Sequence, residues 1–237
     1  MRWLALALTA LALAGCESSQ EKSAQLEKEA KAKAAKLGPT EHSVKIQTPS
    51  KYIQVVSASA LHGSETDAVA IVLRNESSKG MGGMPIQFVV KGNGGQDLYT
   101  NATPGLASDQ TTVPVIPAHG ILTWVDDQVT YEGTVEAVNA VVGEGRPSDA
   151  HEMAVSAVHL ESESGSEFLT GTVTNKSSVA QHGLSVFAFA KRGTSVVAAG
   201  TALVQTLAPG QSQSFQVFPA GASPKGTQLS AQAPANL

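Results

Sequence analysis

The chain contains one cysteine, Cys16, among its 237 residues, so no disulfide can form within it. Any folded part must therefore be held together by burial of apolar side chains, without a covalent bridge between sheets. The sequence also lacks an obvious membrane span near its start. The apolar run Trp3–Ala14, interrupted by Thr9, has 12 residues, and a helix that crosses a bilayer needs about 20.

The single cysteine follows this short apolar run directly. Leu13-Ala14-Gly15-Cys16 resembles the bacterial lipobox, in which the cysteine is lipidated and becomes the first mature residue. Ala12-Leu13-Ala14 also fits ordinary signal-peptidase cleavage, which would leave a free thiol. The lipobox resemblance implies a diacylglycerol on Cys16 and often a third chain such as palmitate, and two or more chains make a durable anchor.

We therefore expect residues 1–15 to be a lipoprotein signal peptide. The lipid on Cys16 would hold the protein on the bacterial cell membrane or outer membrane, on its extracytoplasmic side.

The next segment has no apolar stripe. Residues 17–36 are rich in Ala, Glu and Lys, which favour helix, and Glu27 and Lys31 stand four apart in the favourable order. A coiled coil would need apolar residues at sustained heptad spacing, and these are missing. The pattern predicts a partly helical, solvated tether over residues 16–46.

The chain has no excess of basic residues. Removal of residues 1–15 takes away Arg2 and leaves 15 basic against 20 acidic side chains, a net charge of about −5. That balance argues against a broad surface for nucleic acid and against electrostatic docking on anionic lipid. The length from residue 47 onward suits two domains of roughly 95 residues each.

A repeat supports two domains. Asn75-Glu-Ser-Ser78 and Asn175-Lys-Ser-Ser178 each follow an apolar run, and from there the two copies align without a gap at an offset of 100. MPIQFVVKGNGG is matched in this way by LSVFAFAKRGTS. We expect domains at 47–145 and 150–237, joined near residues 145–148, and we expect each to fold alone.

Both copies have the composition of strands. Short runs of Val, Thr, Ile and Phe are separated by Gly, Pro, Asn and Ser. We predict strands at 51–60, 66–74, 84–91, 96–101, 110–116, 120–127 and 134–142, and in the second copy at 152–161, 166–174, 184–191, 195–205, 212–218 and 226–232. The fold class is therefore all-β, with two tandem antiparallel immunoglobulin-like β-sandwich domains. The expected core anchors are Phe88, Trp124, Phe168 and Phe215.

The order of these features resembles a known family. A strand ending in Asn and small polar residues, an apolar strand, a glycine turn and a Pro-Gly turn into an aromatic strand are similar to the bacterial FxLYD-type domain. The resemblance covers residues 152–232 best and 51–142 more loosely. It implies tandem domains on an envelope lipoprotein without an assigned activity. Where the family has Tyr-Asp before the glycine turn, this chain has Ala190-Lys191 and Val90-Lys91.

Motifs for catalysis are missing from the sequence. There is no Gly-x-Ser-x-Gly elbow, and Gly92-Asn-Gly-Gly95 reads as a hairpin turn rather than a phosphate loop. Three Asn-x-Ser/Thr sequons begin at Asn75, Asn101 and Asn175, and we interpret them as turn chemistry. The sequence predicts no catalytic residue and no cofactor, so we expect the protein not to be an enzyme.

Metal binding is the main alternative. His159, Glu161 and Glu163 alternate and could share one strand face, but we prefer to interpret them as the solvated face of a strand whose apolar partners are Val158 and Leu160. Asp126 and Asp127 are adjacent, so they point to opposite faces of a strand and cannot easily share an ion.

Two methionines could suggest copper(I). Met81 and Met84 are three apart, but the repeat aligns Met84 with Leu184 and Met81 with Gln181. This alignment predicts Met84 in a core and Met81 at an exposed tip. Phe187 and Phe189 make the other face of the second copy's strand apolar too, which leaves open which face is buried.

The sequence thus favours a lipid-anchored, non-catalytic extracytoplasmic module for binding or assembly. Its expected partner is an envelope protein or glycan, and not nucleic acid. A metal-binding envelope protein, for copper or a divalent cation, is the alternative.

Overall fold

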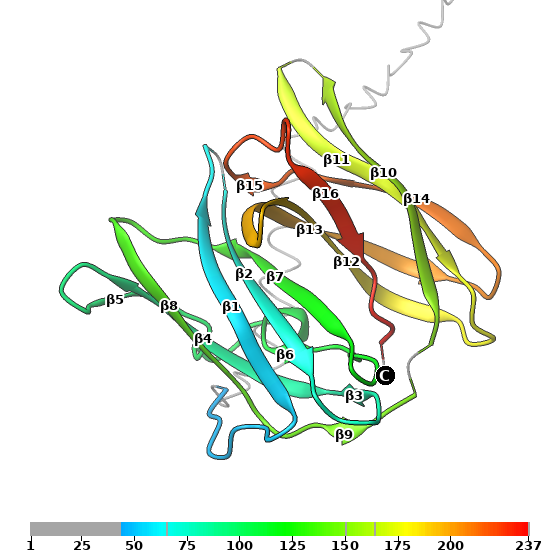
Figure 1. Cartoon of the computed structure of the whole chain (residues 1–237), viewed down its shortest axis with the longest axis horizontal. Helices are drawn as coiled ribbons and strands as arrows, with labels where there is room; N and C mark the ends of the chain where they lie inside the picture. Colours follow the sequence, from blue (N-terminus) through cyan, green and yellow to red (C-terminus); the bar gives the residue numbers. More distant parts are fainter. Residues whose placement is uncertain (1–43, 65, 150, 164, 237) are drawn as a thin grey trace, which may run out of the picture. The chain divides into compact units, whose positions relative to one another are not determined.

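The computed structural model describes residues 44–64, 66–149, 151–163 and 165–236. Cys16, the signal peptide and nearly all of the tether lie outside these ranges. The described residues belong to one compact unit, and their strands pair antiparallel throughout (Figure 1). The all-β prediction is confirmed. Within these ranges no helix has the length and apolar character needed to span a membrane.

The first half of the unit is a sandwich of two sheets. One sheet has the strand order β1 (Ile53–His62), β2 (Asp67–Asn75), β7 (Ile121–Val129). The other is built around β4 (Met84–Gly92), which pairs with β5 (Asp97–Thr100), β6 (Thr112–Val113) and β8 (Val135–Val142). Buried side chains from both sheets form one apolar cluster, and we call this half the first sandwich.

The second half repeats this topology. One sheet has the order β10 (Met153–Glu163), β11 (Ser166–Asn175), β14 (Ser212–Val217). The other has the order β15 (Ala220–Gly221), β13 (Ser195–Leu207), β12 (Gln181–Arg192), β16 (Gln228–Gln232). The second sandwich matches the first in its six main strands, whereas the short strands β3, β6, β9 and β15 have no counterpart strand in the described residues of the other half. The registers Ile53↔Asn75 and Met153↔Asn175 differ by the offset of the sequence repeat.

Most predicted strands are present within a few residues of their predicted ends. The exception is 110–116, where only Thr112–Val113 is a strand. The short 3-10 helix η1 (Ser108–Gln110) precedes it, and Pro114 and Pro117 cannot donate to a ladder. The sequence pattern missed β3 (Met81–Gly82), β9 (Arg146–Pro147) and β15, because two residues carry no recognisable alternation.

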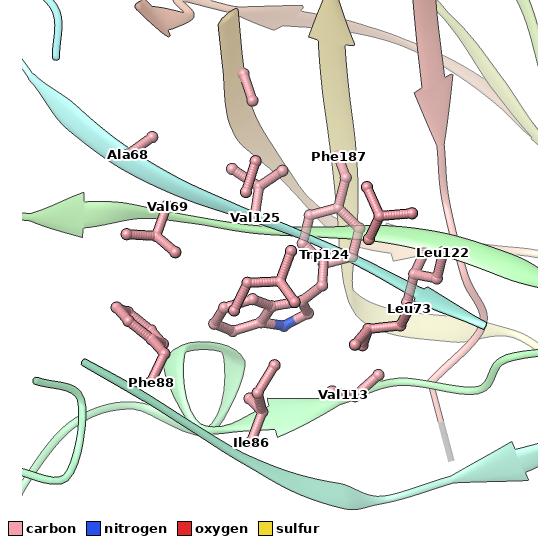
Figure 2. Packing of buried hydrophobic residues seen from close by; sticks show 14 of the residues in the cluster. Ala68, Val69, Leu73, Ile86, Phe88, Val113, Leu122, Trp124, Val125 and Phe187 are labelled. Carbon is pink, nitrogen blue, oxygen red and sulfur yellow. The ribbon is translucent and has the colours of Figure 1, made fainter. Parts of the chain in front are cut away.

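The predicted anchors are buried. Trp124 and Phe88 are fully buried and meet edge to face, with ring centroids 5.9 Å apart. Figure 2 shows the Trp124 indole in the middle of the cluster, with Phe88 and Ile86 below it. Phe215 is buried in the core of the second sandwich. Phe168 is also buried, but it lies outside that core cluster, and its ring centroid is 5.5 Å from that of the exposed Phe218. Each such side chain contributes roughly 1.5–3 kcal/mol by leaving water.

Strand β12 is buried on both faces. Leu184 and Val186 point into the core of the second sandwich. Phe187 and Phe189 belong instead to the cluster of the first sandwich, together with outward-facing residues of β2 and β7 such as Ala70 and Val125. Figure 2 shows Phe187 and Phe88 on opposite sides of β7. The ambiguity of this strand is thus resolved, because the outer face of β12 is covered by the first sandwich.

Hydrogen bonds add to this junction. The two carboxylate oxygens of Asp127 accept hydrogen bonds from the backbone N–H (2.6 Å) and the hydroxyl (2.7 Å) of Thr201. The Gln232 amide accepts from the N–H of Thr123 (2.8 Å) and donates to the carbonyl of Ile121 (2.9 Å). That each half folds alone stays a prediction, and either half without its partner would expose an apolar sheet face.

Phe187→Gln tests how much this junction contributes. The aligned residue in the first sandwich is the half-buried Gln87, so glutamine suits the strand but not the apolar contact. We expect the free energy of unfolding to fall by about 2–4 kcal/mol in urea titrations. The control Gln87→Ala should cost under about 0.5 kcal/mol. Equal, small effects at both positions would mean that the junction stabilises little.

Candidate binding groove

A groove of about 680 Å³ lies at the end of the first sandwich where β1 begins and β2 ends. Four stretches of chain line it: Ser50–Tyr52 before β1, the turn after β2, the turn before β7, and the chain that follows β8. It is larger than a second hollow, of about 500 Å³, which residues such as Leu122 and Ala233 line. None of the four stretches is long, so the groove depends on how they are tied together.

Asn75 ties two of these stretches. Its side chain is fully buried. The amide nitrogen donates to the carbonyls of Lys79 (2.8 Å), Ile116 (3.1 Å) and Pro117 (2.9 Å). The amide oxygen accepts from the N–H (2.9 Å) and the hydroxyl (2.8 Å) of Ser77. One side chain therefore fixes both turns, which is the turn chemistry predicted for this sequon.

Backbone hydrogen bonds complete the frame of the groove. Glu76 N–H donates to the Tyr52 carbonyl (2.8 Å), and His119 N–H donates to the Ser77 carbonyl (3.2 Å). His119 has a positive φ of 55°, a conformation that costs energy for a non-glycine residue and persists where its surroundings hold it. The groove is thus formed before any ligand arrives.

The far wall of the groove comes from the chain between the two sandwiches. Strand β9 pairs with β3, with Met81 opposite Pro147, and the two lie side by side in Figure 1. Met81 also exchanges two hydrogen bonds with Ile116 (3.0 and 2.8 Å). The prediction of an exposed Met81 is therefore wrong: the residue is 5% exposed, because two neighbouring segments cover it.

The lining combines an aromatic ring, apolar surface and charges of both signs. Tyr52 is 43% exposed, and the Lys51 ammonium lies 5.2 Å from the centre of its ring. Pro147 is exposed and supplies apolar surface beside the buried Met81, and charged side chains stand around it: Glu76, Lys79 and Glu144. A rigid hollow with an exposed aromatic residue and polar groups around it suits non-covalent binding of a ligand or peptide.

The other candidate residues lie elsewhere. Cys16 is outside the described residues. Met84 is fully buried in the core, as predicted. Asp126 and Asp127 point to opposite faces of β7, since Asp126 is buried and Asp127 binds Thr201 of the other sandwich. Asn101 and Asn175 are fully buried and hydrogen-bonded, as Asn75 is.

The alternating residues of β10 form a surface pair. His159 Nε2 lies 2.8 Å from Glu161 Oε1, and His159 Nδ1 lies 2.7 Å from the Ala157 carbonyl. Both hydrogen bonds raise the pKa of His159, and the one to the Ala157 carbonyl has the larger effect. In the ranges that the structure describes, no three His, Cys, Asp or Glu side chains are grouped so that they could hold a metal ion.

Sequence reasoning missed the groove itself. Tyr52 stood in a predicted strand, and residues 145–148 were expected to be a simple joint. The groove could be recognised only once β9 was seen to fold back onto β3, a pairing that no local pattern announces.

Comparisons with known proteins yield no family for the chain. No family model and no curated protein matches it. Among solved structures, the chain is similar to an exo-chitosanase of Amycolatopsis orientalis, with 12% identity and a TM-score of 0.28 over 76% of this chain and 25% of that one. It is also similar to red sea bream transglutaminase, with 14% identity and a TM-score of 0.19 over 87% of this chain and 30% of that one. The chain spans a third or less of the length of either protein.

Proposed function

We propose that this protein is a lipid-anchored, extracytoplasmic and non-catalytic module that binds an envelope protein or glycan. The lipobox at Cys16 supports the anchor and the location. The groove at the end of the first sandwich supports the binding role, and it is the observation that carries the proposal. The tether would hold the sandwiches away from the lipid surface.

The construction of the groove favours binding. Its walls are fixed by the buried side chain of Asn75 and by the pairing of β3 with β9, so little ordering remains to be done when a ligand binds. Tyr52 offers a large, exposed contact surface with few rotatable bonds. The charges on the rim have both signs, which suits a partner of mixed polarity rather than a polyanion.

Site-specific photo-crosslinking in intact cells tests this proposal. A benzophenone amino acid at position 52 should give a discrete adduct with a partner. The matched control is position 152, since the Glu152 carbonyl accepts from Lys176 as the Tyr52 carbonyl accepts from Glu76. We expect no such adduct from position 152, because among the described residues the chain after β16 contacts Gln181–Gly183 through the side chains of Gln181 and Asn236 and not through a paired strand like β9.

The captured partner must then bind in purified form. We expect Tyr52→Ala to weaken its affinity at least about tenfold, the loss that accompanies removal of one aromatic contact in a binding site. Adducts of the same kind at positions 52 and 152, or an affinity unchanged in Tyr52→Ala, would contradict the assignment of the groove.

A further inference from the structure

Asp126 is a carboxyl group buried in the first sandwich, apart from the groove. Its side chain is on the inner face of β7, and the residue is 3% exposed. Oδ1 accepts a hydrogen bond from the N–H of Gln128 (3.0 Å), whereas Oδ2 is buried and has no hydrogen-bond partner among the described residues. An ionised carboxylate at such a position has lost its hydrating water without gaining enough hydrogen bonds from the protein in exchange. Protonation removes the charge and with it this desolvation cost.

The groups that act on Asp126 come from three elements. On β7 itself these are Asp127 and Gln128, on η1 they are Asp109 and Gln110, and on β5 it is Tyr99. Burial raises the pKa of Asp126 to about 6, and the charges of Asp127 and Asp109 add to the rise. The Gln128 N–H and the Gln110 side chain lower it in part. The ionisable neighbours are thus all acidic, and ionisation of Asp126 sets like charges against one another.

The η1 segment, residues 107–110, lies against β7 at this point. Two hollows of about 190 and 120 Å³ flank Asp109, and Ser185 and Phe187 of β12 line the other side of both. The segment therefore covers the junction of the two sandwiches. It is anchored at one end, where the Gln110 carbonyl accepts from the side chain of Asn101 (2.9 Å).

We propose that the η1 segment is a pH-sensitive flap over the junction of the two sandwiches, closed when Asp126 is protonated and loosened when Asp126 ionises. The repulsion between Asp126 and Asp109 would move the part of the segment that Asn101 does not hold. The flap does not depend on the groove or on the lipid anchor, so its test is independent of theirs.

The sign of the pH effect follows from the raised pKa. Between about pH 4 and pH 6 the folded chain binds more protons at Asp126 than the unfolded chain, so stability falls as the pH rises through this window. Because the pKa of Asp126 is raised from 3.8 to about 6, ionisation of this group alone should increase the unfolding equilibrium constant about a hundredfold across the window. Above pH 7, Asp126 should add no further pH dependence to that constant.

NMR on the labelled chain from residue 17 onward, which contains the whole compact unit, tests the flap. The carboxyl carbon of Asp126 should titrate near pH 6. Protection of the Gln110 amide, which donates to the Ala107 carbonyl, should fall at least about tenfold between pH 5 and pH 7.5. The Gly92 amide in the β4–β5 hairpin of the same sandwich should not change.

Two variants separate the causes. Asp126→Asn should keep the Gln110 amide protected at both pH values. Asp109→Asn removes the opposing charge and should keep a smaller pH response with a lower midpoint. A carboxyl of Asp126 that titrates near pH 4 in the unaltered chain, or a pH response that persists in full in Asp126→Asn, would overturn the proposal.

Discussion

Cys16→Ser is expected to move the protein from the membrane fraction to the soluble fraction almost completely. The apolar run before residue 16 is too short to hold the chain in a bilayer, so retention should depend on acyl chains attached to the cysteine. Since each buried CH₂ contributes about 0.8 kcal/mol, loss of two chains should reduce membrane binding far more than a hundredfold, by rough estimate. Cell fractionation with immunoblotting measures the effect.

Mass spectrometry of the unaltered protein provides the complementary result. We expect a mature chain that begins at Cys16 and carries a diacylglycerol. The neighbouring change Ser18→Ala is a suitable control and should remain in the membrane fraction. A chain that begins at Gly15 with a free thiol would support ordinary signal-peptidase cleavage instead. Normal processing and membrane retention of Cys16→Ser would rule out the lipobox interpretation.

Large effects on folding are also expected from Asn75→Ala and Asn175→Ala. Asn175 repeats the bonding of Asn75: it donates to the carbonyls of Val179 (2.8 Å) and Leu207 (3.0 Å) and accepts from the N–H of Ser177 (2.9 Å). Alanine leaves these groups without their partner at a fully buried position. We expect each change to lower the free energy of unfolding by about 2–4 kcal/mol in thermal or urea unfolding.

This pair of variants also tests the independence of the two sandwiches. If the compact unit unfolds in one transition, either variant should lower the same midpoint. If each sandwich unfolds alone, each variant should shift one of two transitions and leave the other in place. Asn139→Ala, an exposed position on β8, should change stability by less than about 0.5 kcal/mol. Effects no larger than this control at Asn75 and Asn175 would show that the two turns are held by other contacts.

The strands could be predicted because their information is local. Alternation in MPIQFVVK and the turn residues at Gly92–Gly95 set β4 and its hairpin without knowledge of the rest of the fold. The role of Asn75 as a turn residue was predictable for the same reason. Its complete burial was not, because the carbonyls that it binds at Ile116 and Pro117 lie some 40 residues away.

The features that escaped prediction depend on contacts between distant segments. Nothing within β12 indicates what covers Phe187 and Phe189, so one apolar face could not be preferred over the other. Met81 was placed at a tip because its aligned partner is the polar Gln181, yet Gln181 is itself 3% exposed. Asp109, one of the two carboxylates that repel Asp126, stands on η1, and only the last residue of η1, Gln110, lies in the predicted strand 110–116.

The two sandwiches meet through different sheets, and this difference bears on how many copies of the repeat can stack. The β1–β2–β7 sheet of one copy packs on the β12–β13 sheet of the other, so unlike faces meet, as in a head-to-tail array that could in principle continue. The two sheet faces that point away from the junction differ from the two that meet there, at positions that the repeat aligns. Ala70 and Val72 correspond to Thr170 and Thr172, and Phe187 to Gln87, all three polar residues being half-buried rather than buried. At these three positions the outer faces resemble those of capping repeats, which are polar where an inner repeat is apolar. A third copy stacked in the same way would therefore meet two threonines or a glutamine where the existing junction has alanine, valine and phenylalanine.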